Sequence, residues 1–152
     1  MTTNNPPTIC ELLGEFTTTM LVTHGPAGLR ARPMAMLEVE ADGRIWFITS
    51  EDSAKAHEIE KNTHVHLVFQ KDHDAFLSVN GHADLVKDAS RVERLWSEEF
   101  RPFFPEGKTD PAIALIAVTP QDAEYWVHRE PKVSGSWKAE DAYIHGTKPE
   151  AH

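Results

Sequence analysis

The sequence predicts a mainly β protein with flanking helices, arranged as a small antiparallel barrel. Short segments rich in β-branched and aromatic residues recur along the chain, which is typical of strands. Most of these segments are separated by turns of only a few residues, and such short connections join antiparallel neighbours. Three segments with helical spacing and capping signals interrupt the strands, so we expect helices packed outside a barrel.

Length and charge narrow the class of protein. The chain has 152 residues, which suits a single domain, placed here at 1–146 with a loose polar tail at 147–152. Its net charge of −9 argues against nucleic-acid binding and against docking on anionic membranes. No apolar run reaches the roughly 20 residues that span a bilayer, and the N-terminus lacks the pattern of a secretory signal. The single cysteine, Cys10, excludes an intramolecular disulfide and favours the cytosol.

The first third of the chain predicts a short helix and two hairpins. Thr8 and Glu11 have the spacing of a capping box, so a helix should follow Thr8. Residues 17–24 predict a strand, and 25–28 a turn. Positions 29–40 alternate in character, which predicts one long strand with two distinct faces. The apolar face would carry Leu29, Ala31, Pro33, Ala35, Leu37 and Val39, and the mixed face Arg30, Arg32, Met34, Met36, Glu38 and Glu40. A turn at 41–43 should pair this strand with a strand at 44–49.

The remaining segments continue the alternation of strands and helices. In order, we expect a helix at 54–61 capped by Ser53, strands at 64–70 and 75–86, a helix from a capping box at Ser90 to Phe100, a loop rich in proline and aromatic residues at 100–111, strands at 113–118 and 123–128, and an irregular strand at 133–144.

The most informative stretch for function is residues 46–62. An apolar strand runs into the hydroxyl residues Thr49, Ser50 and Ser53, and a helix carrying Lys55 follows at once. Hydroxyls, the free backbone N–H groups of a first helical turn and a lysine cation together predict an anion site. A phosphate-bearing cofactor is the natural ligand of such a site.

Arg32 could add a second cation to this anion site. If its strand pairs with 44–49, its guanidinium would lie near Ser53 and could bind the same phosphate bidentately. The alternative is that Arg32 and Lys55 are solvated surface charges. Glu51 and Asp52 count against the site, because they place negative charge beside the expected anion.

Taken together, these segments resemble the pyridoxamine 5′-phosphate oxidase-like proteins, and within them the general stress protein branch. The resemblance covers about residues 12–126. It rests on the motifs Arg32-Pro33-Met34, 46–50, 53–62, 65–69, 81–83, 95–96, 104–107, 110–111 and 124–126. Each motif is short, and their order and spacing together carry the resemblance.

The resemblance implies an antiparallel Greek-key split β-barrel that binds FMN. It also implies a homodimer with FMN at the subunit interface. The phosphate would meet Arg32, Ser53 and Lys55, and the ring would lie along residues 46–49. The cofactor-binding residues so implied are Arg32, Pro33, Met34, Phe47, Ile48, Thr49, Ser50, Ser53, Lys55 and, from the partner subunit, Trp126. The alternative for Trp126 is a core aromatic.

The chain departs from the oxidase proper in its substrate motifs. The basic residue expected soon after Arg32 is absent from 36–38, the tyrosine, arginine and serine pattern is absent from 95–100, and the arginine–histidine motif is absent from 127–137. We therefore do not expect oxidation of pyridoxamine phosphate. The function expected is FMN binding, with flavin-dependent oxidoreductase activity as one hypothesis. A non-catalytic flavin-binding stress protein and a haem- or deazaflavin-binding member of the fold are the alternatives.

Two further clusters have weaker implications. His64 and His66 share one face of a strand, but no third ligand has a suitable spacing, so we predict no metal. The aromatic residues Trp96, Phe100, Phe103 and Phe104 should pack the third helix on the barrel, with a pocket wall or a dimer seam as alternatives. No nucleophile–base motif is visible, and no catalytic residue is predicted.

Overall fold

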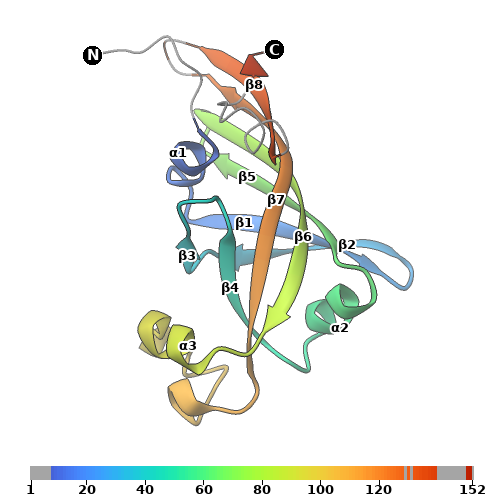
Figure 1. Ribbon diagram of the computed structural model, residues 1–152, viewed down its shortest axis with the longest axis vertical. Helices are drawn as coiled ribbons and strands as arrows, with labels where there is room; N and C mark the ends of the chain where they lie inside the picture. The colour runs from blue at the N-terminus through green and yellow to red at the C-terminus, as the bar shows by residue number, and fades with distance from the viewer. Residues whose placement is uncertain (1–7, 129, 131, 140–149, 152) are drawn as a thin grey trace.

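The computed structural model describes residues 8–128, 130, 132–139 and 150–151. In this part of the chain, antiparallel strands form one nine-stranded sheet, and the helices lie around it (Figure 1). The elements are α1 (Ile9–Leu13), β1 (Thr18–Gly25), β2 (Gly28–Ala35), β3 (Glu38–Val39), β4 (Ile45–Ser50), α2 (Ala54–Lys61), β5 (His64–Lys71), β6 (Ala75–Val86), α3 (Ala89–Leu95), the 3₁₀ turns η1 (Glu98–Phe100) and η2 (Gly107–Thr109), β7 (Ile113–Val127), β8 (Val133–Lys138) and β9 (Glu150–Ala151). The predicted class, mainly β with flanking helices, is confirmed.

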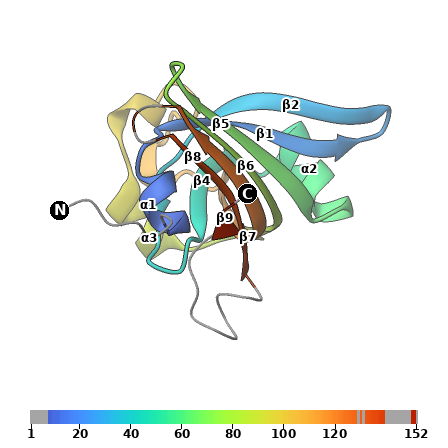
Figure 2. The same ribbon diagram turned by 90° about the horizontal axis from the view of Figure 1, so that it is seen from above.

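The sheet curls into a barrel because its two end strands are consecutive in the chain. The strand order is β2-β1-β5-β6-β7-β4-β3, so β2 and β3 lie at opposite ends. Only Met36 and Leu37 join them, which forces the ends of the sheet toward each other (Figure 2). The enclosed core is apolar, and its largest fully buried side chains include Leu21, Phe47 and Tyr125.

The prediction of a single strand at 29–40 is wrong, and its predicted pairing with 44–49 holds only for the short second part, β3. β2 pairs with β1, where Arg32 lies opposite Leu21, whereas β3 pairs with β4, where Glu38 lies opposite Trp46. The break falls where the chain crosses from one end of the sheet to the other. The predicted turn at 41–43 is confirmed, and Gly43 adopts a φ of +92° there, in the left-handed region that favours glycine.

The apolar face of β2 is the more exposed of its two faces. Leu29 is 68% exposed, and Ala31, Pro33 and Ala35 are exposed with it. Arg32 and Met34 are half-buried on the opposite face. The reason is that Arg32 finds a buried carboxylate inside the fold, described below.

Helix α2 forms as predicted, whereas α3 differs at both ends. Ser53 caps α2, since its Oγ accepts a hydrogen bond from the backbone N–H of Ala56 at 3.2 Å. Asp88 rather than Ser90 caps α3, through a 3.0 Å bond from the N–H of Arg91. The helix ends at Leu95 because Trp96 is extended, and residues 98–100 then form η1 instead of continuing α3.

The two strands predicted at 113–118 and 123–128 are one continuous strand, β7. Pro120 lies inside it, opposite Gly81, at the point where the β6–β7 register shifts. A proline is tolerated at such a bulge because no ladder hydrogen bond is required of it. Gly81 allows the close approach, since a Cβ there would lie 2.7 Å from the carbonyl oxygen of Thr119.

The structure describes only part of the C-terminal segment for which a strand and a tail were predicted. β8 occupies the start of the strand predicted at 133–144, and residues 140–149 and 152 lie outside the described residues. β9 pairs with β8 inside the segment predicted to be a tail. Among the described helices, none combines the length and apolar character needed to cross a membrane.

Candidate functional site

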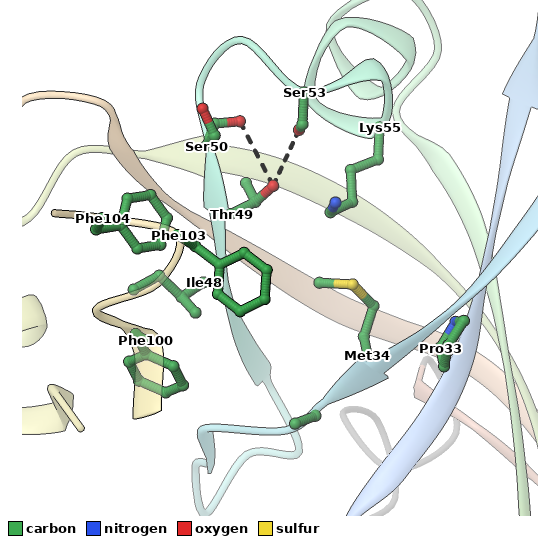
Figure 3. A pocket seen from close by; sticks show the side chains of 11 residues that line it. Pro33, Met34, Ile48, Thr49, Ser50, Ser53, Lys55, Phe100, Phe103 and Phe104 are labelled. Carbon is green, nitrogen blue, oxygen red and sulfur yellow. Dashed lines mark hydrogen bonds between the residues drawn. The ribbon is translucent and has the colours of Figure 1, made fainter. Parts of the chain in front are cut away.

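A cavity of about 470 Å³ opens where β2 and β4 diverge (Figure 3). β3 covers β4 only at Ile45 and Trp46, so beyond Trp46 this edge of β4 has no strand neighbour within the described chain. The cavity is lined by Pro33, Met34, Ala35, Ile48, Thr49, Ser50, Ser53, Lys55, Phe100, Phe103 and Phe104. Most of the cofactor-binding residues expected from the sequence therefore meet here, although the strands that carry them do not pair.

One side of the cavity, the polar wall, consists of Thr49, Ser50, Ser53 and Lys55. The hydroxyls of Thr49 and Ser53 are hydrogen-bonded to each other at 2.9 Å, and Ser53 also caps α2. The first backbone N–H groups of a helix have no partner within the helix. Hydroxyls, free N–H groups and the positive end of the α2 dipole thus face one place.

Lys55 has no anionic partner among the residues that the structure describes. It lines the cavity, and Figure 3 shows its side chain directed into it. Within the described residues, no hydrogen bond or ion pair joins its ammonium group to another side chain or backbone group. Burial, followed by the positive charge of Arg32, lowers the pKa of Lys55 below its ordinary value. An anion bound in the cavity would stabilise the charged ammonium group and so offset both the cost of its burial and its repulsion by Arg32.

The negative charge that argued against this site is compensated at one position. The Glu51 carboxylate forms a 2.8 Å ion pair with Nζ of Lys87. Asp52 lies in the exposed turn before α2, where its backbone N–H donates to the hydroxyl of Ser50.

Arg32 lies beside the cavity and is held by groups of the protein. Its Nη2 donates to Oε1 of Glu58 at 2.9 Å, and its Nη1 donates to Oγ1 of Thr23 at 2.6 Å. It is absent from the cavity lining, but it is close enough to Lys55 to lower that pKa. The guanidinium that the sequence assigned to a phosphate is thus engaged by a carboxylate.

That carboxylate, Glu58, is the residue that sequence reasoning missed. Glu58 is buried, and it accepts hydrogen bonds from Thr23, Arg32 and, at 3.4 Å, Arg30. Burial alone would raise the pKa of Glu58, but the hydrogen bonds from Thr23 and Arg32 and the charges of both arginines outweigh it and lower the pKa. The sequence did contain a signal for this residue. Arg30 and Arg32 lie on one face of a strand, and they require a nearby negative charge if that face is buried.

Two expected site residues lie away from the cavity. The Phe47 side chain is fully buried in the barrel core, so only its backbone lies on the cavity strand. Trp126 is 37% exposed and lies near the opposite end of β7 from Ala114, the residue that pairs with Thr49. That separation is roughly 40 Å along the strand. Trp126 instead lines a second cavity of about 400 Å³ with Val68, Phe76 and Ser78.

The opposite side of the cavity, the aromatic wall, consists of Phe100, Phe103 and Phe104. Phe104 is buried, and the ring of Trp96 packs against it and against Phe100, with ring centres 6.5 and 5.7 Å apart. The aromatic cluster therefore packs the α3 region on the barrel, as expected, and also forms the pocket wall that was the alternative. Phe103 is the exception, at 77% exposed.

The preceding helix, α3, is fixed to the barrel through Arg91. Its guanidinium donates to Glu38 of β3 at 2.7 Å and lies 3.9 Å from the ring centre of Trp46 in β4. Charge-assisted bonds and a cation–π contact of this kind hold α3 against β3 and β4. The aromatic wall is thus tied to the same strand that carries the polar wall.

The open edge of β4 offers backbone groups to a ligand. The backbone N–H of Leu37 donates to the carbonyl of Trp46, which shows that the polar groups of Trp46 point to this edge. In an antiparallel strand the direction alternates, so the N–H and C=O of Ile48 point to the same edge. They face the cavity, where a planar ring with donors and acceptors at its rim could pair with them.

The two histidines that share a strand face, His64 and His66, contact other side chains. His66 is bonded to Asn80 and Ser78 at 2.7 Å each, and His64 lies 3.3 Å from His24. Within the described ranges, no group of three or more histidine, cysteine, aspartate or glutamate residues is placed to bind a metal.

Comparison with known proteins supports a family assignment. A family model described as pyridoxamine 5′-phosphate oxidase like matches residues 5–150. General stress protein 26 of Bacillus subtilis is 33% identical over 82 residues, which cover 51% of this chain and 58% of that protein. The chain thus spans less than two thirds of this relative.

Solved structures agree with the fold. A general stress FMN/FAD binding protein from Xanthomonas citri is 33% identical, with a TM-score of 0.66 and coverage of 76% of this chain and 83% of that one. A protein related to general stress protein 26 from Clostridium acetobutylicum is 23% identical, with a TM-score of 0.71 and coverage of 88% and 94%. The second similarity concerns the fold alone.

Proposed function

Because the chain belongs to the pyridoxamine 5′-phosphate oxidase-like family and has its split-barrel fold, we propose that the cavity between β2 and β4 binds FMN. The observation that carries this proposal is Lys55, a half-buried cation that faces the cavity with no ion-pair partner among the described residues. A phosphate would supply the missing anion. The cavity volume lies within the range typical of small-molecule sites.

The two ends of the cavity suit the two ends of FMN. The phosphate would be held by Lys55, the Ser53 hydroxyl and the first N–H groups of α2. The ring edge would pair with the backbone of Ile48 at the open edge of β4, with Met34 of β2 close by. Arg32 acts behind this site, by adding positive potential while Glu58 holds its guanidinium.

The lining residues favour flavin redox chemistry over acid–base catalysis by the protein. When bound, FMN supplies hydride and single-electron transfer. Lys55 is the one titratable side chain among the lining residues, and no imidazole, carboxylate or thiol lies among them. The residues of this chain therefore bind and orient the cofactor. The same lining also suits a flavin-binding protein without turnover, and reduction by NADH or NADPH followed by reoxidation separates the two.

A homodimer is part of the proposal. Met20, Val68 and Trp126 are large apolar side chains that stay 37–43% exposed on the outside of the sheet. Met20 lies opposite Val68, and Val68 and Trp126 line one cavity, so the three are contiguous. Contiguous exposed apolar groups can mark association surfaces. Trp126 is too far along β7 to reach the cavity of its own subunit, so any contact with FMN would come from the partner. The cytosolic location expected from the sequence stays a prediction.

The proposal is tested by titrating the protein with FMN. Lys55→Ala should weaken FMN binding roughly 10- to 100-fold, because charge-assisted contacts contribute about 1.5–3 kcal/mol. Lys61→Ala is the matched control, since it removes the same charge from the other, exposed end of α2. Equal FMN affinity of the two variants would place the phosphate elsewhere.

A further inference from the structure

Phe103 is more exposed than any other large hydrophobic side chain among the described residues, yet it lines the cavity. It is 77% exposed, while its neighbour Phe104 is 3% exposed in the hydrophobic cluster beneath. Figure 3 shows the Phe103 ring reaching further toward the middle of the cavity than those of Phe100 and Phe104. Phe103 is therefore the member of the aromatic wall that does not belong to the hydrophobic cluster.

The backbone beneath Phe103 is well anchored. The N–H of Phe103 donates to the carbonyl of Phe100 at 3.0 Å, and the N–H of Gly107 donates to the carbonyl of Phe104 at 2.9 Å. The Arg101 guanidinium is paired with Glu98 at 2.9 Å. An exposed aromatic ring on a fixed turn at the mouth of a cavity is placed to contact whatever enters that cavity.

We propose that Phe103 covers the flavin ring and shields it from solvent. The proposal rests on the proposed FMN site and assigns a further residue to it. A planar ring paired by its edge with β4 would have a face that the strand does not cover, and Phe103 lines the same cavity. An aromatic side chain prefers an offset-stacked or edge-to-face contact with such a ring, and the contact would also remove apolar area of Phe103 from water.

Such a cover has a defined consequence for the site. The polar wall fixes the phosphate, and Phe103 limits the access of solvent and of small solutes to the ring. It makes no contact with the phosphate end, so the two contributions to FMN binding should be separable. Phe103 is therefore a binding and shielding residue, and no proton or electron transfer is assigned to it.

The test compares FMN affinity and the access of acrylamide to bound FMN. Acrylamide is a neutral quencher of flavin fluorescence, so the charge of Lys55 does not affect its approach. Phe103→Ala should weaken FMN binding about tenfold and raise the quenching constant of bound FMN severalfold. Phe103→Tyr, which keeps the ring, should retain both properties. Leu29→Ala is the matched control, since Leu29 is similarly exposed at 68% but lies away from the cavity.

The outcomes separate this proposal from the site on which it rests. If the unaltered protein binds FMN and Phe103→Ala changes neither affinity nor quenching, the cover is overturned while the site stands. If the unaltered protein does not bind FMN, both are overturned. Lys55→Ala should lower affinity but leave the quenching of saturated FMN unchanged. An equal rise in quenching in that variant would contradict the division of roles.

Discussion

The polar wall and the aromatic wall face the same cavity but depend on different parts of the sequence. The polar wall is contained in residues 49–55, where hydroxyls, a helix cap and a lysine follow one another. The aromatic wall comes from residues 100–104, and its position depends on contacts with Trp96 and on the attachment of α3 to β3 and β4. The proposed anion site is thus determined locally, whereas the proposed cover of the ring depends on the tertiary fold.

This difference has a consequence for mutations. A change in the polar wall should alter ligand affinity with a small effect on folding. A change in the aromatic wall should act on folding or on affinity according to which phenylalanine is removed.

The largest effect is expected at the anchor of the aromatic wall. Phe104→Ala should lower the free energy of unfolding by about 3–5 kcal/mol, because it leaves a cavity in a packed cluster. Phe103→Ala should change it by less than about 0.5 kcal/mol, since Phe103 is exposed. Urea unfolding of both variants without ligand measures the contrast, and equal losses would refute the distinction between anchor and cover.

A somewhat smaller effect is expected behind the polar wall. Glu58→Gln should cost about 3 kcal/mol of unfolding free energy, because it leaves Arg32 half-buried without its counter-charge. Glu60→Gln is the control, as it makes the same change at an exposed position of α2. If the two variants unfold at the same urea concentration, the ion pair contributes nothing to the fold.

The same carboxylate predicts a pH dependence. The pKa of Glu58 is lower in the folded protein than its ordinary value, so its contribution is fully present above that value. Stability should therefore fall as the pH drops below about 4.3, the ordinary pKa of a glutamate, toward the folded pKa. The fall should be shallower in Glu58→Gln, and an identical profile in both proteins would contradict the assigned role.

A smaller loss of stability than at Phe104 or Glu58 is expected at the cap of α2. Ser53→Ala should cost about 1 kcal/mol of unfolding free energy, whereas Ser53→Gly should cost only a few tenths, because glycine is a tolerated N-cap. Both variants lack the hydroxyl, so both should weaken FMN binding by a similar factor. An affinity loss in Ser53→Ala alone would mean that Ser53 acts through helix stability and not through contact.

Local signals predicted that the residues of the polar wall lie together. The capping pattern identified Ser53 and the limits of α2, and the strand–hydroxyl–helix order brought Thr49, Ser50, Ser53 and Lys55 to one place. These features depend on hydrogen bonds between residues close in the chain. These features can therefore be predicted from the sequence without knowledge of the tertiary contacts.

The features that were missed depend on partners far apart in the sequence. Alternation at 29–40 predicts extended backbone but does not show which strand pairs with it. The sequence therefore did not reveal that β2 pairs with β1 whereas β3 pairs with β4. The mixed face of β2 is the half-buried one because Glu58, an acidic residue in a polar helix, lies inside and pairs with Arg32. The cavity exists because β2 and β4 diverge, where pairing had been predicted.

The central claim, that Lys55 binds the phosphate of FMN, is tested most directly by comparing FMN with riboflavin, which lacks the phosphate. Dissociation constants of both ligands are measured for the unaltered protein and for Lys55→Ala. The account predicts that the unaltered protein prefers FMN by roughly 10- to 100-fold and that Lys55→Ala loses most of this preference while its riboflavin affinity is nearly unchanged. An FMN preference of the same size in both proteins would contradict it.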